Sequence, residues 1–391
     1  MKKYLSTSLT LFLAVIPIIF SCTDQSKHTP SDHKIVIDVD ESIKLTYSEI
    51  FESLEIIPLE STHELLVGDI DQILFSENRI FIVDEKKTQS LFIFDRSGKL
   101  VKRIESKGLG PGELYKPTSA QVIENDNQLV IFDGRQGKCM FYDYEGNFLH
   151  EIRYTDWLAT YDWIYHKEHL YFYSENGEVF EDRLFKTTVG MQTVSRINTF
   201  YRGDATIING MKNAYLYPTY DGSSLFFNER NSNRILEIQE DVIKRQYVFS
   251  FSKDEFKPDP QRVYQAIDFT REFWRQDQYA LGDGLIDGKR ISLLSINKGR
   301  ESKLALWTKE DNTVKIIEAI QNDMDHLTPD IIGLHSYFCG PDAYIWVAFP
   351  RELDEFEKTF RPSQNLNSEF AKQYAIGADD NPILFVYSFK K

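Results

Sequence analysis

A glycine-rich run is the first feature of this sequence that suggests ligand chemistry. Gly108, Gly110 and Gly112 are separated by single residues, and glycines let backbone amides approach a phosphate closely. A nucleotide-binding loop should lead into a helix, whereas this run leads to Pro117 and a strand-like segment. We therefore expect a turn between two structural units and no bound nucleotide.

Carboxylates and histidines give little support for catalysis. Asp84, Asp95, Asp133 and Asp143 end strand-like runs at repeated positions, where aspartate side chains usually cap turns, although they could also gather around a cation. The eight histidines include no pair at the helical spacing of a zinc site. The motifs of serine hydrolases, P-loop proteins and zinc proteases do not occur. We expect no metal and no cofactor, and we assign no catalytic residue.

Aromatic residues and two insertions provide the candidate ligand-binding residues. Aromatic rings stack on sugars and peptides, but they also fill the cores of packed sheets. Residues 252–279 include a predicted helix over 261–274, and residues 350–374 include apolar side chains at helical spacing over 353–360. The candidates are Tyr161, Trp163, Tyr215, Tyr217, Arg271, Trp274, Asp283 and His335.

The N-terminus indicates export. Lys2 and Lys3 precede an apolar run from Leu9 to Phe20 that is too short to span a bilayer stably. The run ends at Cys22 in a pattern that resembles the lipobox of bacterial lipoproteins, in which this cysteine carries the lipid. An ordinary signal peptide is the alternative, since Phe20 replaces the small residue usual there. We expect residues 1–21 to be a lipoprotein signal peptide and residues 22–34 a flexible tether.

Charge and cysteine content narrow the class of protein. The formal net charge is −15, and an acidic chain without a basic run is a poor partner for nucleic acid. Aromatic residues make up 14% of the chain, which is enough for a packed core. Cys139 and Cys339 lie in apolar, strand-like contexts, where we expect buried thiols. An oxidising compartment would also allow a disulfide between them.

The elements that carry these residues form a repeat. Two copies of a pattern of four short strands lie between residues 68 and 154, with turn residues between the strands. The second strand recurs around Ile80, Leu129, Leu170, Leu225, Ile291 and Tyr344, which are 49, 41, 55, 66 and 53 residues apart. Spacings near ~40 to 50 residues, lengthened by insertions, are typical of propeller blades.

The ends of the chain predict how the ring closes. Residues 54–59 and residues 381–389 are both strand-like, and their pairing would leave no open sheet edge at the junction. We therefore predict that residues 35–391 form an all-β domain, a six-bladed β-propeller of four-stranded antiparallel blades. In this fold the N- and C-terminal strands close the ring, and short helical insertions interrupt the blades.

One segment carries a family resemblance. Residues 104–117, with the run Gly-Leu-Gly-Pro-Gly-Glu, resemble the linker of NHL-type repeats. The chain as a whole resembles the six-bladed β-propeller lipoproteins of the bacterial envelope, which share this linker, an early Ile-Pro-Leu strand and a final Asn-Pro-x-Leu strand. The resemblance implies a fold and a membrane-anchored envelope location, periplasmic or surface-exposed. It implies no reaction and no catalytic residues.

Two functional hypotheses remain at this point. The first is a non-catalytic recognition module that is tethered to the membrane by its lipid and binds a glycan or peptide at the central channel. An envelope protein is a further expected partner. The second is a hydrolase or lyase with a cation-dependent site at the channel mouth, which rests on analogy of fold alone.

Overall fold

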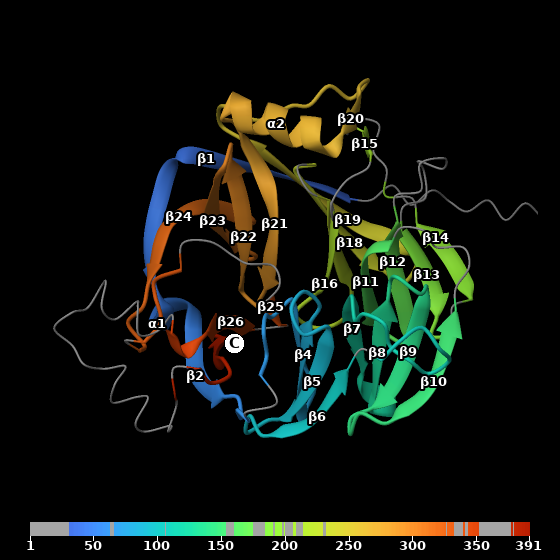
Figure 1. Ribbon diagram of the computed structural model, residues 1–391. Coiled ribbons are helices and arrows are strands. Elements are labelled where there is room, and N and C mark those ends of the chain that lie inside the picture. Colours follow the sequence, from blue (N-terminus) through green and yellow to red (C-terminus); the bar gives the residue numbers. More distant parts are fainter. Residues whose placement is uncertain are drawn as a thin grey trace, which may run out of the picture.

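The computed structural model of the chain (Figure 1) is dominated by antiparallel β-sheet. The residues that it describes are 31–62, 66–105, 107–153, 160–174, 184–190, 192–197, 199, 206–208, 214–229, 232–325, 327–331, 339–340, 343–351, 377 and 379–391.

Two complete four-stranded sheets follow the predicted repeat. The first contains β3 (Gln72–Phe75), β4 (Arg79–Asp84), β5 (Ser90–Asp95) and β6 (Leu100–Glu105). The second contains β7 (Ser119–Ile123), β8 (Gln128–Asp133), β9 (Lys138–Asp143) and β10 (Phe148–Arg153), with the 3-10 turn η1 (Glu124–Asp126) between β7 and β8. The middle strands of each sheet are buried almost throughout, because neighbouring sheets cover both of their faces.

Further four-strand groups occur along the chain. One sheet contains β11 (Thr160–His166), β12 (His169–Ser174), β13 (Leu184–Thr188) and β14 (Thr193–Ile197). A nine-stranded sheet contains one run of β16 (Ala214–Pro218), β17 (Leu225–Glu229), β18 (Arg234–Gln239) and β19 (Val242–Phe251). It also contains a second run of β21 (Tyr279–Asp287), β22 (Ile291–Lys298), β23 (Glu301–Thr308) and β24 (Thr313–Gln321).

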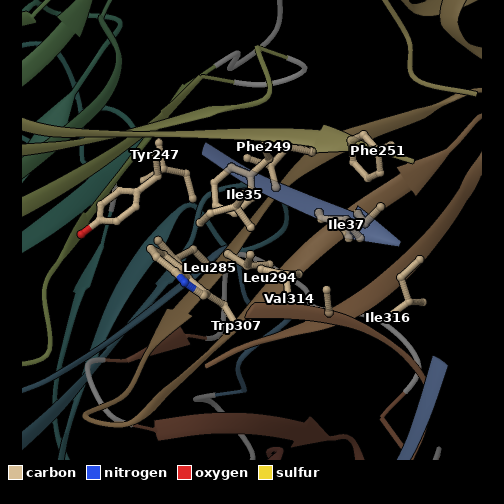
Figure 2. Close-up of a cluster of buried hydrophobic side chains, with 14 of the residues drawn as sticks. Ile35, Ile37, Tyr247, Phe249, Phe251, Leu285, Leu294, Trp307, Val314 and Ile316 are labelled. Atoms are coloured by element: carbon tan, nitrogen blue, oxygen red, sulfur yellow. The ribbon is translucent and has the colours of Figure 1, made fainter. Parts of the chain in front are cut away.

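Strand β1 (Ser31–Thr46) joins these two runs. Its first half pairs in parallel with β19, from Ser31 opposite Arg245 onward, and its second half pairs in parallel with β24. Ile35 and Ile37 point into a buried cluster that includes Phe249 and Trp307, as Figure 2 shows. The strand therefore begins four residues inside the tether expected over 22–34. The reason is that its alternating isoleucines find an apolar partner surface.

The chain ends close as predicted. β27 (Ile383–Phe389) pairs with β2 (Phe51–Pro58) on one side and with β26 (Ala343–Ala348) on the other. β25 (Cys339–Gly340) completes this sheet. Phe385 and Tyr387 of β27 are fully buried, so the two ends of the chain share one core.

The second strand of each repeat is confirmed where the sequence predicts it. The six equivalent residues lie in β4, β8, β12, β17, β22 and β26, each the second strand of its group. The first strands, β3, β7, β11, β16, β21 and β25, are the inner strands, and neighbouring inner strands contact one another. The described structure is therefore propeller-like.

Short helices lie outside the sheets. α1 (Tyr47–Ile50) follows β1, and α2 (Ala266–Gln276) follows the short strand β20 (Val263–Gln265), which pairs with β15 (Thr206–Ile208). α2 confirms the helix predicted over 261–274, whereas the helix predicted over 353–360 lies outside the described residues. None of the helices in the described ranges has the length and apolar character that a membrane-spanning helix needs.

Candidate functional site

A cavity of about 750 Å³ lies between four neighbouring inner strands, β3, β7, β11 and β16. Its lining runs from the starts of these strands, at Asp71 and Thr118, to the turns that follow them, at Glu124 and Lys167. Apolar, aromatic and polar side chains all contribute. A cavity of this size and mixed character is typical of a ligand-binding site on a rigid frame.

The wall of the cavity is held by side chains that bond to the backbone of the next inner strand. The Gln72 Nε2 donates to the carbonyl of Ala120 at 3.0 Å, and the Ala120 amide donates to the Gln72 Oε1 at 2.8 Å. Gln121 joins β7 to β11 in the same way, through the Trp163 carbonyl at 3.0 Å. These bonds replace a β-ladder between blades, so the wall is formed before any ligand arrives.

Asp162 continues this arrangement into the fourth group. Its Oδ2 accepts a hydrogen bond from the Leu216 amide at 2.8 Å, which ties β11 to β16. Gln72 and Gln121 are 49 residues apart, the same interval as the second strands of their repeats. The sequence analysis missed these residues, and this shared repeat position was the signal that could have identified them.

Three predicted residues meet at the boundary between β16 and β21. The Tyr215 hydroxyl donates to the Asp283 Oδ2 at 3.1 Å, and the Tyr217 hydroxyl donates to the Asp283 carbonyl. The two rings stack with centroids 6.3 Å apart and planes 19° apart. Both tyrosines line the cavity. Asp283 therefore fixes both hydroxyls, while Tyr215 is 7% exposed and Tyr217 is half-buried.

A β-bulge places Asp283 for this contact. The register between β21 and β22 shifts between Leu281 and Leu285, and Asp283 lies between two glycines in this segment. The Asn228 Nδ2 donates to the carbonyl of Gly282 at 2.9 Å and fixes the bulge from β17. Bulges often redirect a strand beside a functional site.

Trp163 also lines the cavity, but its ring is held in the core. It is 4% exposed, and its Nε1 donates to the Ser119 Oγ at 2.5 Å. The ring stacks on Phe172 at 5.7 Å between centroids. Trp163 therefore shapes the wall mainly by packing between two sheets.

His166 lines the cavity next to the turn between β11 and β12. Burial lowers the pKa of this histidine to about 4, with a smaller contribution from the charge of Lys167. Its ring is therefore neutral at pH 7 and offers one donor and one acceptor nitrogen. The Lys167 Nζ donates to the carbonyl of Ser223 at 2.7 Å.

The ionisable side chains of the lining are mainly acidic. They comprise two lysines, one histidine and five carboxylates, namely Lys86, Lys167, His166, Asp71, Glu85, Glu124, Asp162 and Glu168. Lys86 pairs with Asp71 at 2.5 Å, and Glu85 pairs with Lys116 at 2.9 Å. The cavity therefore suits a neutral or cationic ligand better than an anionic one.

The other predicted site residues lie elsewhere. Arg271 and Trp274 are exposed on α2 and are not part of the cavity lining. Tyr161 belongs to β11, but its side chain lies outside the described part of the chain, as do Cys22 and His335. The structure therefore brings together Trp163, Tyr215, Tyr217 and Asp283, and it separates α2 from them.

The repeated aspartates cap turns, as expected. The Asp84 carboxylate accepts from the Gly68 amide at 2.8 Å and from the Lys87 amide at 2.9 Å. Asp133 has the same position in the next repeat and accepts from the Tyr115 amide at 2.7 Å. Asp95 and Asp143 each accept from two amides of the turn that follows. No group of three potential His, Cys, Asp or Glu metal ligands occurs among the described residues.

The glycine-rich run forms a turn, as expected. The Glu113 carboxylate accepts from the Gly110 amide at 2.9 Å, and Gly112 has a φ of +72°, which favours glycine. The buried Lys138 donates to the Gly110 carbonyl at 2.9 Å. Cys139, the residue after Lys138 on β9, is a free, buried thiol, and burial raises its pKa.

A cavity bounded by the inner strands of meandering sheets defines this chain as a β-propeller-like protein. More specifically, it belongs to the family described as Domain of unknown function (DUF4934), whose model matches residues 34–388. No curated protein sequence matches the chain.

Two solved structures share the fold. A protein of Bacteroides fragilis, provisionally described as exported, superposes with a TM-score of 0.66 at 19% identity, over 92% of this chain and 100% of that chain. A member of the DUF4221 family from Bacteroides vulgatus gives a TM-score of 0.50 at 10% identity, over 87% of this chain and 97% of that chain. Identities this low establish likeness of fold alone.

Proposed function

We propose that this chain is an exported, lipid-anchored six-bladed β-propeller that acts as a binding module and takes a glycan or peptide in its channel. Contacts between inner strands support six blades, because they pass from β3 through β7, β11, β16, β21 and β25 and return to β3. The pairing of β2 with β27 supports a closed ring. The linker shared with NHL-type propeller lipoproteins agrees with both.

The observation that carries the binding function is the pre-formed cavity with its pair of tyrosine rings. Asp283 holds the hydroxyls of the buried Tyr215 and the half-buried Tyr217, so the exposed part of the Tyr217 ring needs no reordering when a ligand packs on it. Polar side chains nearby can fix its orientation, and the excess of carboxylates disfavours acidic sugars and acidic peptides.

The test uses neutral and charged glycans and neutral and charged peptides. A glycan array and a peptide array are probed with the mature chain, and each hit is measured by calorimetry. We expect Tyr217→Ala to weaken a true channel ligand at least about ten-fold, the effect of losing roughly 1.4 kcal/mol of contact. Phe148→Ala is the matched control, since Phe148 is an exposed ring (42%) on β10 outside the cavity lining. Equal affinity of both variants would refute a channel site.

The anchor is tested separately. Palmitate labelling of the wild-type chain and of Cys22→Ala in a bacterial host should give label only in the former, because the thioether forms on this cysteine. Equal labelling would refute lipidation and leave export by an ordinary signal peptide. The similar fold of the Bacteroides fragilis protein described as exported agrees with export.

A further inference from the structure

Helix α2 has an apolar face that is exposed in the described part of the chain. Phe269 and Phe273 are buried and pack with Phe256 in a small separate core. On the opposite side Ile267 is 60% exposed and Trp274 is 43% exposed. The helix therefore has one apolar surface for its own core and a second that faces outward.

Arginines surround the outward apolar surface. The Arg300 guanidinium carbon lies 4.9 Å from the centre of the Trp274 ring. Arg271 and Arg275 are exposed on the same helix. The two carboxylates of the helix are paired with arginines, since Asp268 lies 3.8 Å from Arg271 and Glu272 lies 2.9 Å from Arg262. A chain of net charge −15 thus presents, at this place, tryptophan and isoleucine beside arginines.

The segment that leads into α2 starts beside β1, the strand that follows the predicted tether. It begins against the middle of β1, where the Ser252 amide donates to the Ile37 carbonyl at 2.9 Å and Lys253 pairs with Asp40 at 2.5 Å. Ser31 lies opposite Arg245 on β19, about 20 Å from Ser252 at the rise of a strand. Figure 1 shows α2 at the upper margin of the molecule.

The chain outside the sheet sets the reach of the anchor. Nine peptide bonds separate Cys22 from Ser31, which fully extended span about 30 Å. A lipid on Cys22 therefore holds the membrane surface within this distance of Ser31. Ser252, where the segment that leads into α2 begins, lies within this range, at about 20 Å from Ser31.

We propose that the outward face of α2, formed by Ile267, Arg271, Trp274 and Arg300, rests on the anionic headgroups of the membrane that holds the N-terminal lipid. Tryptophan favours the interface between water and hydrocarbon, and arginines near an anionic surface each add attraction. The proposal rests on the anchored location proposed above. A second contact beside the tether fixes the orientation of the channel, which a flexible tether alone leaves free.

Vesicle flotation with the mature chain carrying Cys22→Ser tests this contact without the lipid. Vesicles of phosphatidylethanolamine with phosphatidylglycerol should bind the chain, and vesicles of phosphatidylcholine should bind it at least about ten-fold more weakly. Ile267→Ser with Trp274→Ser should weaken binding at least about ten-fold. Leu149→Ser with Val242→Ser is the matched control, since these side chains are 44% and 49% exposed and should leave binding unchanged.

Fluorescence gives a second measurement that a folding defect would not imitate. The chain carries Trp157→Phe and Trp346→Phe, so that its remaining tryptophans are Trp274 and the buried Trp163 and Trp307. Brominated lipid in the vesicles should then quench part of the tryptophan emission, and Trp274→Phe should remove that quenching. Binding that is equal in the test and control pairs, or quenching that survives Trp274→Phe, would overturn the proposal. Capture of an envelope protein by α2 with no vesicle binding would overturn it as well.

The two proposals fail in different ways. If Cys22→Ala loses palmitate labelling but vesicle binding does not depend on α2, the lipid anchor is supported and the α2 contact is refuted. If vesicle binding needs Trp274 but the wild-type chain and Cys22→Ala take up equal palmitate label, the α2 contact is supported and the lipid anchor is refuted.

Discussion

Replacing Glu151 with glutamine should leave the buried ammonium of Lys138 without its carboxylate partner. Lys138 is fully buried in β9, and its Nζ lies 3.0 Å from the Glu151 Oε2 and 2.9 Å from the Gly110 carbonyl. Glu151 also accepts from the Gly112 amide at 2.9 Å. This pair therefore fixes the glycine-rich linker between the first two sheets.

The expected cost follows from burial. Breaking a fully buried ion pair from one side costs about 3 to 5 kcal/mol. The Glu151 side chain keeps 19% exposure, which screens part of the interaction, so we expect Glu151→Gln to lower the free energy of unfolding by about 2 to 4 kcal/mol. Lys138→Met with Glu151→Gln removes both charges and should return to within about 1 kcal/mol of the wild-type chain.

Urea unfolding at pH 7 measures these free energies. A cost below about 0.5 kcal/mol for Glu151→Gln, or a double variant whose loss equals the sum of the single losses, would refute the reasoning because neither fits a buried uncompensated charge.

Acid gives an independent check on the same pair. Burial opposes ionisation of Glu151, but the Gly112 amide and the Lys138 ammonium outweigh it and lower the pKa of this carboxyl below its ordinary 4.5. The folded pKa is then below the unfolded one, so the stabilisation is present above the unfolded pKa and is lost as pH falls through the folded pKa. The difference between wild type and Glu151→Gln should therefore shrink in acid.

Three further predictions follow from other parts of the ring. The free energy of unfolding should fall between pH 7 and pH 5 by about 1 to 2 kcal/mol less in His166→Gln than in the wild-type chain. The reason is that the folded pKa of His166, about 4, lies below the unfolded 6.5, so acid favours the unfolded wild-type chain. Equal decreases in the two chains, measured by urea unfolding, would contradict this. Gln72→Ala removes two bonds to Ala120 and should lower the free energy of unfolding by about 1 to 3 kcal/mol, whereas an unchanged urea midpoint would show that the wall needs no such bonds. Deleting residues 383–391 removes β27, the partner of both β2 and β26, and should abolish the cooperative thermal transition; a sharp transition would show that the ring does not depend on this closure.

The repeat made most of the fold predictable. Apolar runs such as residues 80–83 and 129–132, each followed by turn residues, are local signals that mark buried strands and their order. The strand-like ends of the chain indicated closure for the same reason. Ile56 opposite Phe385 and Leu54 opposite Tyr387 fulfil that prediction.

Strand β1 was missed because its partners are distant and it lies outside the repeat. The tether was expected to end at Lys34, and the first four residues of β1, Ser31 to Lys34, are all polar. Ile35 and Ile37 follow in a stretch rich in charge. Their burial depends on the apolar face made by Phe249 and Trp307, far along the chain. Parallel addition to the outer edges of two strand groups has no local sequence signature.

The candidate site was predictable only in part. Aromatic density near the inner strands pointed to Trp163, Tyr215 and Tyr217, which all contribute to the cavity lining, but density alone cannot tell how far each ring is buried between sheets. That difference depends on register, and register at Asp283 depends on a bulge. Arg271 and Trp274 have the composition of a binding surface, and the fold places that surface on α2 outside the cavity lining.

The polar wall of the cavity limits where selectivity can arise. Gln72, Gln121 and Asp162 already bond to neighbouring strands, so recruiting them to a ligand would weaken the junctions between blades. Of the described lining residues near the turns after the inner strands, His166 and Glu124 do not bond to the backbone of a neighbouring strand group, whereas Lys167 bonds to the Ser223 carbonyl. Differences in ligand preference between related chains should therefore arise at this end of the cavity, while the bonds between inner strands stay unchanged.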